Sequence, residues 1–216
     1  LLSILLAKHF KISSTLYERN KDCRLHNKFS GRSINLALSQ RGINALQNAD
    51  IFDKSFNKLL IPMYGRMIHD INGVQKLQPY SNKKEDCINS VSRAEINKVL
   101  LNKAEETRRV KITFSSECEK IDFKTDLMTI NNKDIPINYP LFGTDGYKSV
   151  IAKEINKQYD EHVICNDINH SYKELSIPSK NNEFQLDPNA LHIWPRHDLM
   201  LIALPNQDKT FTCTLF

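Results

Sequence analysis

The sequence predicts a mixed α/β fold in which an α/β part is followed by an antiparallel β-sheet. Apolar residues recur at helical spacing in residues 1–10 and 34–50, and residues 13–18 have the composition of a buried strand. From residue 170 onward, short apolar runs are separated by Pro, Asn and Asp, which is typical of strands joined by turns. We expect strands in this last part at residues 171–177, 190–194, 199–204 and 210–216.

The segment between these two parts predicts one clear helix and several short strands. Ser92 is a candidate N-cap with Glu95 three residues later, as in a capping box, and the helix that follows is apolar on one face. Apolar patterning predicts strands at residues 64–70, 77–80, 110–114, 120–123, 127–130 and 139–142. The last of these enters residues 143–146, where two glycines permit a tight turn.

The composition is typical of a soluble globular protein and argues against two classes of partner. Of the 216 residues, 40% are hydrophobic and 25% are charged. The net charge of +5 is scattered, so we expect no nucleic-acid binding, which usually needs a concentrated basic stripe with aromatic residues. No apolar run approaches the length of a membrane span, so no membrane contact is expected from this segment.

The cysteines favour a reducing compartment. They stand at positions 23, 87, 118, 165 and 213, which is an odd number with wide spacing. Because there is no C-x-x-C pair, we expect neither a zinc site nor a disulfide framework. A cytoplasmic location is the simplest expectation.

Residues 31–42 combine a basic flank with a predicted helix start. Gly31 and Arg32 precede Ser33, a candidate N-cap, and apolar residues from Ile34 onward fall at helical spacing. A cation, a cap and a helix N-terminus that point the same way suit a phosphate group. An ordinary surface helix with a basic flank is the alternative.

Residues 1–18 have the pattern of the second half of a β-α-β dinucleotide-binding unit. Glu18 would end the second strand of that unit, where an acid binds a ribose hydroxyl. The G-x-G-x-x-G turn that precedes the helix of such a unit is absent, and both ends of the sequence look cut, so we expect a fragment of a longer protein. The alternatives are a solvated strand-end acid and a chain that has lost the usual dinucleotide site.

Short motifs along the whole chain resemble one enzyme family. They are LYER at 16–19, GRSINLALS at 31–39, GRMIH at 65–69, LQPY at 77–80, SR at 92–93, GTDG at 143–146, LHIWP at 191–195 and IALPN at 202–206. In this order and at these separations they resemble the kynurenine 3-monooxygenases, which are flavin-dependent aromatic hydroxylases of the p-hydroxybenzoate hydroxylase-like group. Glu18 and the Asp145-Gly146 pair are generic to the wider flavoprotein class.

The resemblance implies FAD and NADPH as cofactors and the hydroxylation of L-kynurenine by O2 to 3-hydroxy-L-kynurenine. This reaction belongs to tryptophan degradation and NAD biosynthesis. It requires no catalytic acid or base from this segment, and we expect a monomer or homodimer. The alternatives are a flavin hydroxylase or halogenase with another aromatic substrate, and a non-catalytic truncated remnant. If a C-terminal anchor follows, the location would be the mitochondrial outer membrane.

The resemblance also assigns site residues. In the family, an arginine and a tyrosine hold the substrate carboxylate, and they correspond here to Arg66 and Tyr80. The apolar pocket residues correspond to Leu191, Ile202, Leu204 and Phe216. Cofactor contacts correspond to Glu18, Arg19, Arg32, Ala37, Arg93, Cys118, Asp145 and Gly146. The alternatives from the residues alone are a surface arginine paired with a nearby acid together with a half-buried tyrosine, core packing of the apolar residues, and a plain β-turn at residues 143–146.

The resemblance implies that the chain alternates between two domains. Residues 1–60 and 93–168 would form a Rossmann-like FAD-binding domain, and residues 61–92 an excursion into the substrate domain. Residues 169–216 would begin the antiparallel sheet of that domain, which is incomplete. One departure from the family pattern is Ile151, which stands where relatives have an arginine.

Overall fold

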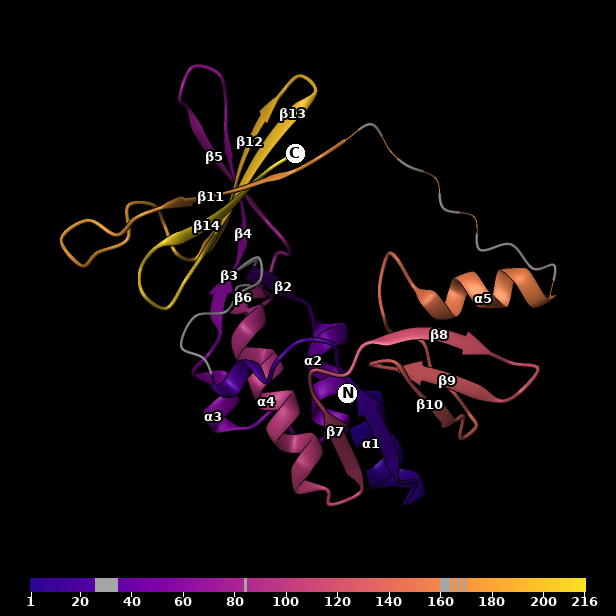
Figure 1. Ribbon diagram of the computed structural model, residues 1–216. Coiled ribbons are helices and arrows are strands. Elements are labelled where there is room, and N and C mark those ends of the chain that lie inside the picture. The colour runs from indigo at the N-terminus through magenta and orange to yellow at the C-terminus, as the bar shows by residue number, and fades with distance from the viewer. Residues whose placement is uncertain (26–34, 84, 160–163, 165, 167, 169) are drawn as a thin grey trace.

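The computed structural model describes residues 1–25, 35–83, 85–159, 164, 166, 168 and 170–216, and these form the mixed α/β fold that the sequence predicts (Figure 1). Their strands make sheets of six, three, three and two strands. In Figure 1 the six-stranded sheet lies at one end of the molecule and helices α1 to α4 lie at the other. Within the described ranges, no helix is long and apolar enough to cross a membrane.

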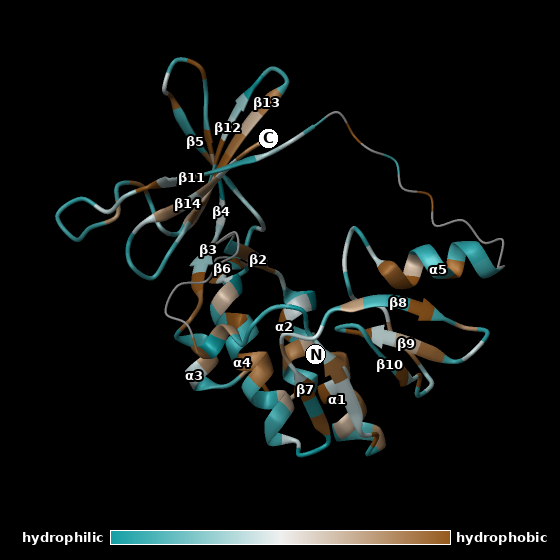
Figure 2. Ribbon diagram, viewed as in Figure 1, coloured by the Kyte–Doolittle hydropathy of each residue, from teal (hydrophilic) through white to brown (hydrophobic). Residues whose placement is uncertain are grey.

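The helical end contains the parallel strand pair and two of the helices. Its elements are α1 (Leu2–Phe10), β1 (Ser14–Tyr17), α4 (Arg93–Glu106) and β7 (Val110–Thr113). Ile4, Ala104 and Val110 belong to one buried core, and Figure 2 shows hydrophobic residues on α1, α4 and β7. The expected buried strand β1 is only half-buried, because β7 is its one hydrogen-bonded neighbour in the described part of the chain.

The predicted start of α4 is confirmed, but only one of the two hydrogen bonds of the expected capping box is formed. The Ser92 hydroxyl accepts a hydrogen bond from the backbone N–H of Glu95 at 3.4 Å. The Glu95 carboxylate instead accepts from Lys98 at 2.7 Å, so the capping box is half formed. This arrangement leaves Arg93 as the first, exposed residue of the helix.

The helix expected over residues 34–50 is wrong in its first half. Residues 35–38 form β2 (Asn35–Leu38), and α2 (Gln40–Asn48) begins only after Ser39. The large apolar residues Leu36 and Leu38 alternate with the smaller residues Asn35 and Ala37. A strand period of two therefore fits this stretch as well as the helical period does. Pairing decides between them, because β2 is hydrogen-bonded to β6 (Ile88–Ser92), which also pairs with β3 (Ile61–Met63). Gly31, Arg32, Ser33 and Ile34 lie outside the described residues.

Two short elements flank this sheet. The helix α3 (Lys54–Asn57) is capped by Asp53, whose carboxylate accepts from the N–H groups of Ser55 and Phe56 at 2.8 Å. The 3-10 turn η1 (Cys23–Leu25) is tied to α4 by Arg24, whose guanidinium donates to Asn102 at 2.9 Å and pairs with Glu105. Both contacts add to the packing of the helical end.

A separate antiparallel meander follows α4 and β7. It consists of β8 (Cys118–Asp122), β9 (Leu127–Ile130) and β10 (Lys133–Pro136), with α5 (Val150–Tyr159) beside β8 (Figure 1). The strand expected at residues 139–142 is wrong. Tyr139 and Phe142 are more than half exposed and no described strand runs beside them, so the segment has no ladder to join.

The four strands expected after residue 170 are confirmed, and two earlier strands join them. The sheet contains, in spatial order, β11 (Lys173–Ile177), β14 (Phe211–Leu215), β13 (Leu199–Pro205), β12 (Ala190–Arg196), β4 (Gly65–His69) and β5 (Gln75–Pro79). The expectation of an antiparallel sheet needs one correction, because β12 and β4 are parallel. They come from distant parts of the chain, so no hairpin dictates their direction.

One face of this sheet is closed by aromatic packing. His69 Nε2 and His192 Nδ1 are 2.8 Å apart, and His192 Nε2 donates to the Asp187 carbonyl at 2.8 Å. Since a carbonyl only accepts, His192 carries its proton on Nε2 and His69 donates to its Nδ1. The His69 ring stacks on Trp194 with centroids 4.1 Å apart. Both imidazoles are buried, and both ring nitrogens of His192 are hydrogen-bonded.

We predict that replacing Gly65 by Ala destabilises the β4–β5 hairpin. A Cβ at residue 65 would lie 2.5 Å from the backbone oxygen of Gln78, which cannot rotate away. The expected loss is about 1–3 kcal/mol in the free energy of unfolding, measured by urea denaturation. Gly42→Ala is the matched control, because its Cβ meets only the mobile end of Leu38 and lies in a helix. Equal stability of Gly65→Ala and wild type would contradict the close approach.

We predict that stability falls as the pH is lowered through about 6.5, the ordinary pKa of histidine. Burial lowers the pKa of both His69 and His192, and the charge of Arg196 acts in the same direction on His69. The unfolded chain therefore binds protons that the folded chain excludes, so stability present above this pH is lost below it. Asp187 faces the pair as well, and its charge raises the pKa of His192. Urea midpoints between about pH 7.5 and 5 measure the slope. His69→Gln keeps the donor to His192 and should reduce the slope; an unchanged slope would exclude the pair as its source.

Candidate functional site

The register of the six-stranded sheet brings the expected substrate residues to one face. Paired residues on neighbouring strands share a face, and so do residues two apart on one strand. Arg66 lies opposite Leu191, and Ile193, two residues on, lies opposite Ile202. Leu204 is two residues beyond Ile202 on the same strand. We call this side of the sheet the open face, since His192 and Trp194 belong to the other side.

Tyr80 and Phe216 belong to the same face. Arg66 is opposite Gln78, and Tyr80 stands two residues after Gln78. The backbone of Phe216 exchanges hydrogen bonds with Met200, which is two residues before Ile202. Leu204 is buried, Leu191 and Ile202 are half-buried, and Phe216 is 41% exposed. The six residues therefore form a continuous apolar strip with two polar groups at one end.

Arg66 and Tyr80 are in direct contact at that end. The Arg66 guanidinium carbon lies 5.2 Å from the centre of the Tyr80 ring. Within the described residues Arg66 has no acidic partner, which disfavours a surface arginine paired with a nearby acid. The Tyr80 hydroxyl is buried and has no hydrogen-bond partner in the described part of the protein. Burial raises the pKa of Tyr80, and the charge of Arg66 opposes this shift, so the hydroxyl stays protonated.

Glu18 and Arg19 follow β1, as expected. The Glu18 carboxylate accepts from the backbone N–H of Asn20 at 2.8 Å and from its side-chain amide at 2.7 Å. The Glu18 backbone continues the pairing with β7 through its bond to Thr113. Glu18 is half-buried and Arg19 is exposed. Both lie at the carboxyl end of a parallel strand, where α/β proteins bind nucleotides.

Arg93 and Ala37 lie on the three-stranded sheet and its helix. Arg93 is exposed at the N-terminus of α4, and no hydrogen bond or ion pair joins it to another described residue. Ala37 is exposed on β2, directly opposite Ser90 of β6. Arg32, the remaining basic residue expected at the cofactor, lies outside the described residues.

Asp145 and Gly146 lie in the turn that precedes α5. Asp145 accepts from the Ser149 hydroxyl at 2.6 Å and from the N–H of Val150 at 2.7 Å. Burial raises the pKa of Asp145, but these bonds outweigh it and leave the pKa below its usual value. Gly146 has φ +84°, which a glycine adopts without strain. The aspartate is thus a helix cap in addition to any contact with a ligand.

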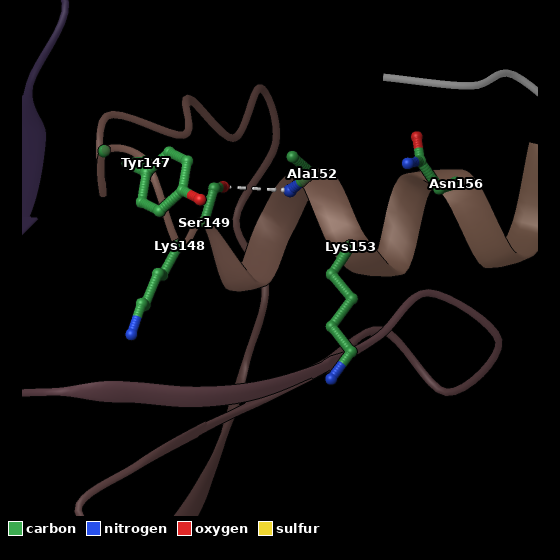
Figure 3. A pocket seen from close by; sticks show the side chains of 7 residues that line it. Tyr147, Lys148, Ser149, Ala152, Lys153 and Asn156 are labelled. Atoms are coloured by element: carbon green, nitrogen blue, oxygen red, sulfur yellow. Dashed lines mark hydrogen bonds between the residues drawn. The ribbon is translucent and has the colours of Figure 1, made fainter. Parts of the chain in front are cut away.

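A cavity of about 600 Å³ adjoins this turn (Figure 3). It is lined by Gly146, Tyr147, Lys148, Ser149, Ala152, Lys153 and Asn156. Burial raises the pKa of the Cys118 thiol, and the charge of Asp145 acts on it in the same direction. Ile151, at the position of the family's arginine, packs against Gly143, where a Cβ would come within 3.1 Å of it.

The structure thus gathers the substrate residues more closely than the cofactor residues. Arg66 touches Tyr80, whereas no described contact joins Glu18 or Arg93 to Asp145. Sequence reasoning missed Asn35 and Ser90, which are buried polar residues between the six-stranded sheet and the sheet of β2, β6 and β3. The only sequence signal for Asn35 is a polar residue in the strand-like alternation of residues 35–38, and Ser90 has no comparable signal.

Comparison with known proteins gives a consistent match. No family model matches the chain. The chain is 40% identical to the kynurenine 3-monooxygenase of Myxococcus xanthus over 223 aligned positions, which cover 100% of the chain and 47% of the relative. It is 41% identical to that of Anopheles gambiae, with 93% and 42% covered. The chain therefore spans about half the length of the curated relatives it matches.

Solved structures agree on the fold. PqsL of Pseudomonas aeruginosa, described as a probable FAD-dependent monooxygenase, superposes with a TM-score of 0.73 at 12% identity. The match covers 99% of this chain and 56% of PqsL. At this identity the likeness concerns the fold alone. The chain is therefore related by sequence to the kynurenine 3-monooxygenases over its whole length, and it has the fold of a flavin-dependent monooxygenase.

Proposed function

We propose that the protein carrying this chain is an FAD- and NADPH-dependent monooxygenase that converts L-kynurenine and O2 to 3-hydroxy-L-kynurenine. The observation that carries the proposal is the contact of Arg66 with Tyr80 at the end of the apolar strip on the open face. The similarity to kynurenine 3-monooxygenases supports the choice of substrate.

Arg66 and Tyr80 would hold the substrate carboxylate. A guanidinium offers a planar pair of donors that matches a carboxylate, and a protonated phenol adds one directional donor. The buried Tyr80 hydroxyl, which has no geometric hydrogen-bond partner among the described residues, adds support, because a buried polar group without a partner costs about 1–3 kcal/mol and a bound carboxylate would satisfy it.

Leu191, Ile202, Leu204 and Phe216 would hold the aromatic ring. Small-molecule sites are mostly apolar and use a few polar groups for orientation, and the open face has this composition. A ring lying along the strip would have its carboxylate near Arg66. The apolar wall would keep water from the reacting atoms and fix which ring carbon is presented.

The described residues also suit FAD. The carboxylate of Glu18 would bind the ribose, and the cation of Arg93 would bind a flavin oxygen or phosphate. Asp145 and Gly146 would contact the ribityl and pyrophosphate region. The backbone of Cys118 would lie near the adenine end. Arg93 is exposed at a helix N-terminus and has no ion-pair partner among the described residues, and this favours an anionic ligand. FAD would supply the oxygen chemistry, with NADPH as reductant. Arg19, Arg32 and Ala37 would complete the contacts.

The division into domains and the location of the protein follow from the same proposal. Residues 1–60 and 93–168 would bind the cofactor, and residues 61–92 and 169–216 would form the substrate side. The described cysteines are all free thiols, which supports a reducing compartment and hence the cytoplasm. A monomer or homodimer is proposed, and an outer mitochondrial membrane location would require a C-terminal anchor.

The reaction can be tested with protein expressed from the complete coding sequence. We expect a yellow protein whose NADPH oxidation rises with L-kynurenine and yields 3-hydroxykynurenine. Stimulation by a different aromatic compound alone would assign another hydroxylase or halogenase. A colourless protein that takes up no added FAD would indicate a non-catalytic remnant.

We predict that Tyr80→Phe has opposite effects on stability and on binding. Removing the unpartnered hydroxyl should raise the free energy of unfolding of the ligand-free protein by about 1 kcal/mol. The same change should weaken kynurenine binding several-fold, because one donor to the carboxylate is lost. Urea denaturation and equilibrium dialysis measure the two effects.

Arg66→Ala and Arg109→Ala serve as a matched pair for the same experiment. Arg66→Ala should weaken kynurenine binding by about 1.5–3 kcal/mol, the usual value of a hydrogen bond to a charged group. Arg109 is exposed and donates to the Lys11 carbonyl, away from the open face, so its removal should leave binding unchanged. Loss of flavin without loss of kynurenine affinity in Arg66→Ala would place Arg66 at the cofactor.

A further inference from the structure

One backbone carbonyl of the six-stranded sheet accepts hydrogen bonds from the three-stranded sheet formed by β2, β6 and β3. The oxygen of Pro205, at the end of β13, accepts hydrogen bonds from the side-chain amide of Asn35 at 2.9 Å and from the hydroxyl of Ser90 at 2.8 Å. Asn35 belongs to β2 and Ser90 to β6, so both donors come from the three-stranded sheet. Two donors from one sheet thus converge on a single atom of the other.

The contact is buried and supported on both sides. Asn35 is 7% exposed and Ser90 is 1% exposed, so water has little access to replace either donor. The Asn35 amide lies 3.1 Å from the Ser90 hydroxyl and 2.6 Å from the side-chain oxygen of Asn206. Asn206 donates in turn to the hydroxyls of Thr210 and Thr212. The network therefore fixes the whole turn between β13 and β14.

This contact connects the two halves of the candidate site. Ser90 is the register partner of Ala37, which is expected on the cofactor side. Pro205 directly follows Leu204, which is expected in the wall for the substrate ring. A cavity of about 430 Å³ opens between the two sheets beside the contact, lined by Ser90, Pro205 and Thr212 among others. The bond from Ser90 to Pro205, at 2.8 Å, therefore links the two sides directly.

We propose that Asn35 and Ser90 are positioning residues for the hydroxylation of the substrate ring. By holding the Pro205 carbonyl, they fix the separation between the Leu204 wall and the strand that carries Ala37. The inference rests on the proposed function and extends it to residues that touch neither substrate nor cofactor. Hydroxylation depends on the distance between the ring and the oxygen donor, and a misplacement of about 1 Å can cost roughly 100-fold in rate.

The test compares four forms of the protein expressed from the complete coding sequence: wild type, Ser90→Ala, Ser90→Thr and Thr107→Val. Ser90→Thr keeps the hydroxyl, and the adjoining cavity has room for its methyl group. Thr107→Val is the matched control, because it removes a hydroxyl that donates to a backbone carbonyl at 2.7 Å at the far end of α4. Asn35→Asp, which keeps the shape but removes the donor, is the second test of the contact.

Four quantities are measured for each form: the melting temperature, the dissociation constant for L-kynurenine by equilibrium dialysis, kcat/KM for L-kynurenine, and the 3-hydroxykynurenine formed per NADPH oxidised. Uncoupled turnover transfers two electrons from NADPH to O2 and releases hydrogen peroxide, which is assayed as the balance. Ser90→Ala and Asn35→Asp should lower product per NADPH at least twofold, weaken kynurenine binding, and reduce kcat/KM by about 10- to 100-fold. Ser90→Thr should restore all three quantities toward wild type.

The outcomes separate the inference from the proposed function. If Ser90→Ala and Thr107→Val lower the melting temperature alike and neither changes coupling or the dissociation constant, the contact is only structural and the inference fails. If wild-type protein shows no kynurenine-dependent NADPH oxidation, the proposed function fails and the positioning role falls with it.

Discussion

The pairing of β4 with β12 is the constraint on which the candidate site depends. It sets Arg66 opposite Leu191, and a shift of one residue would turn Arg66 to the opposite face of the sheet. The hydrogen bond between His69 and His192 joins the same two strands on that opposite face. A slip in register would break this buried bond and leave one ring nitrogen of each imidazole without its partner, so the packing of the closed face stabilises the register that the open face needs.

The two faces of this sheet differ in what covers them. Phe184, Leu186 and Trp194 pack against the buried Phe211 and Cys213 on the closed face. On the open face, Met200 and Phe216 remain about 40% exposed, and the three-stranded sheet reaches it near Pro205. The closed face thus supplies stability, while the open face keeps apolar surface that is free to bind. One sheet performs both tasks because alternate residues along each strand serve opposite faces.

The spacing of apolar residues predicts the helices and strands well where either the helical or the strand period alone fits the sequence. The strands after residue 170 and the helix from Arg93 follow from alternation and from a cap, which are local properties. Residues 35–38 fit both the helical and the strand period, and they form a strand because β2 pairs with β6. The parallel pairing of β12 and β4 joins segments more than 120 residues apart, so no turn signal could reveal it. Arg66 and Tyr80 were found only through the family resemblance, since an arginine and a tyrosine 14 positions apart carry no pattern of their own.

The electrostatics of the open face explain how so few polar groups could select a substrate. Burial keeps the Tyr80 phenol protonated, so it faces a ligand as a donor, and Arg66 is a permanent donor beside it. A permanent cation beside a second donor favours an anion, and in the proposed substrate, kynurenine, the anionic group is the carboxylate. The remaining contacts are apolar and cannot discriminate by hydrogen bonding, so they must discriminate by shape. On the proposed function, the distance between the Leu204 wall and the opposing sheet would then be the selective quantity. Two hydrogen bonds from the opposing sheet end on Pro205, the residue next to Leu204.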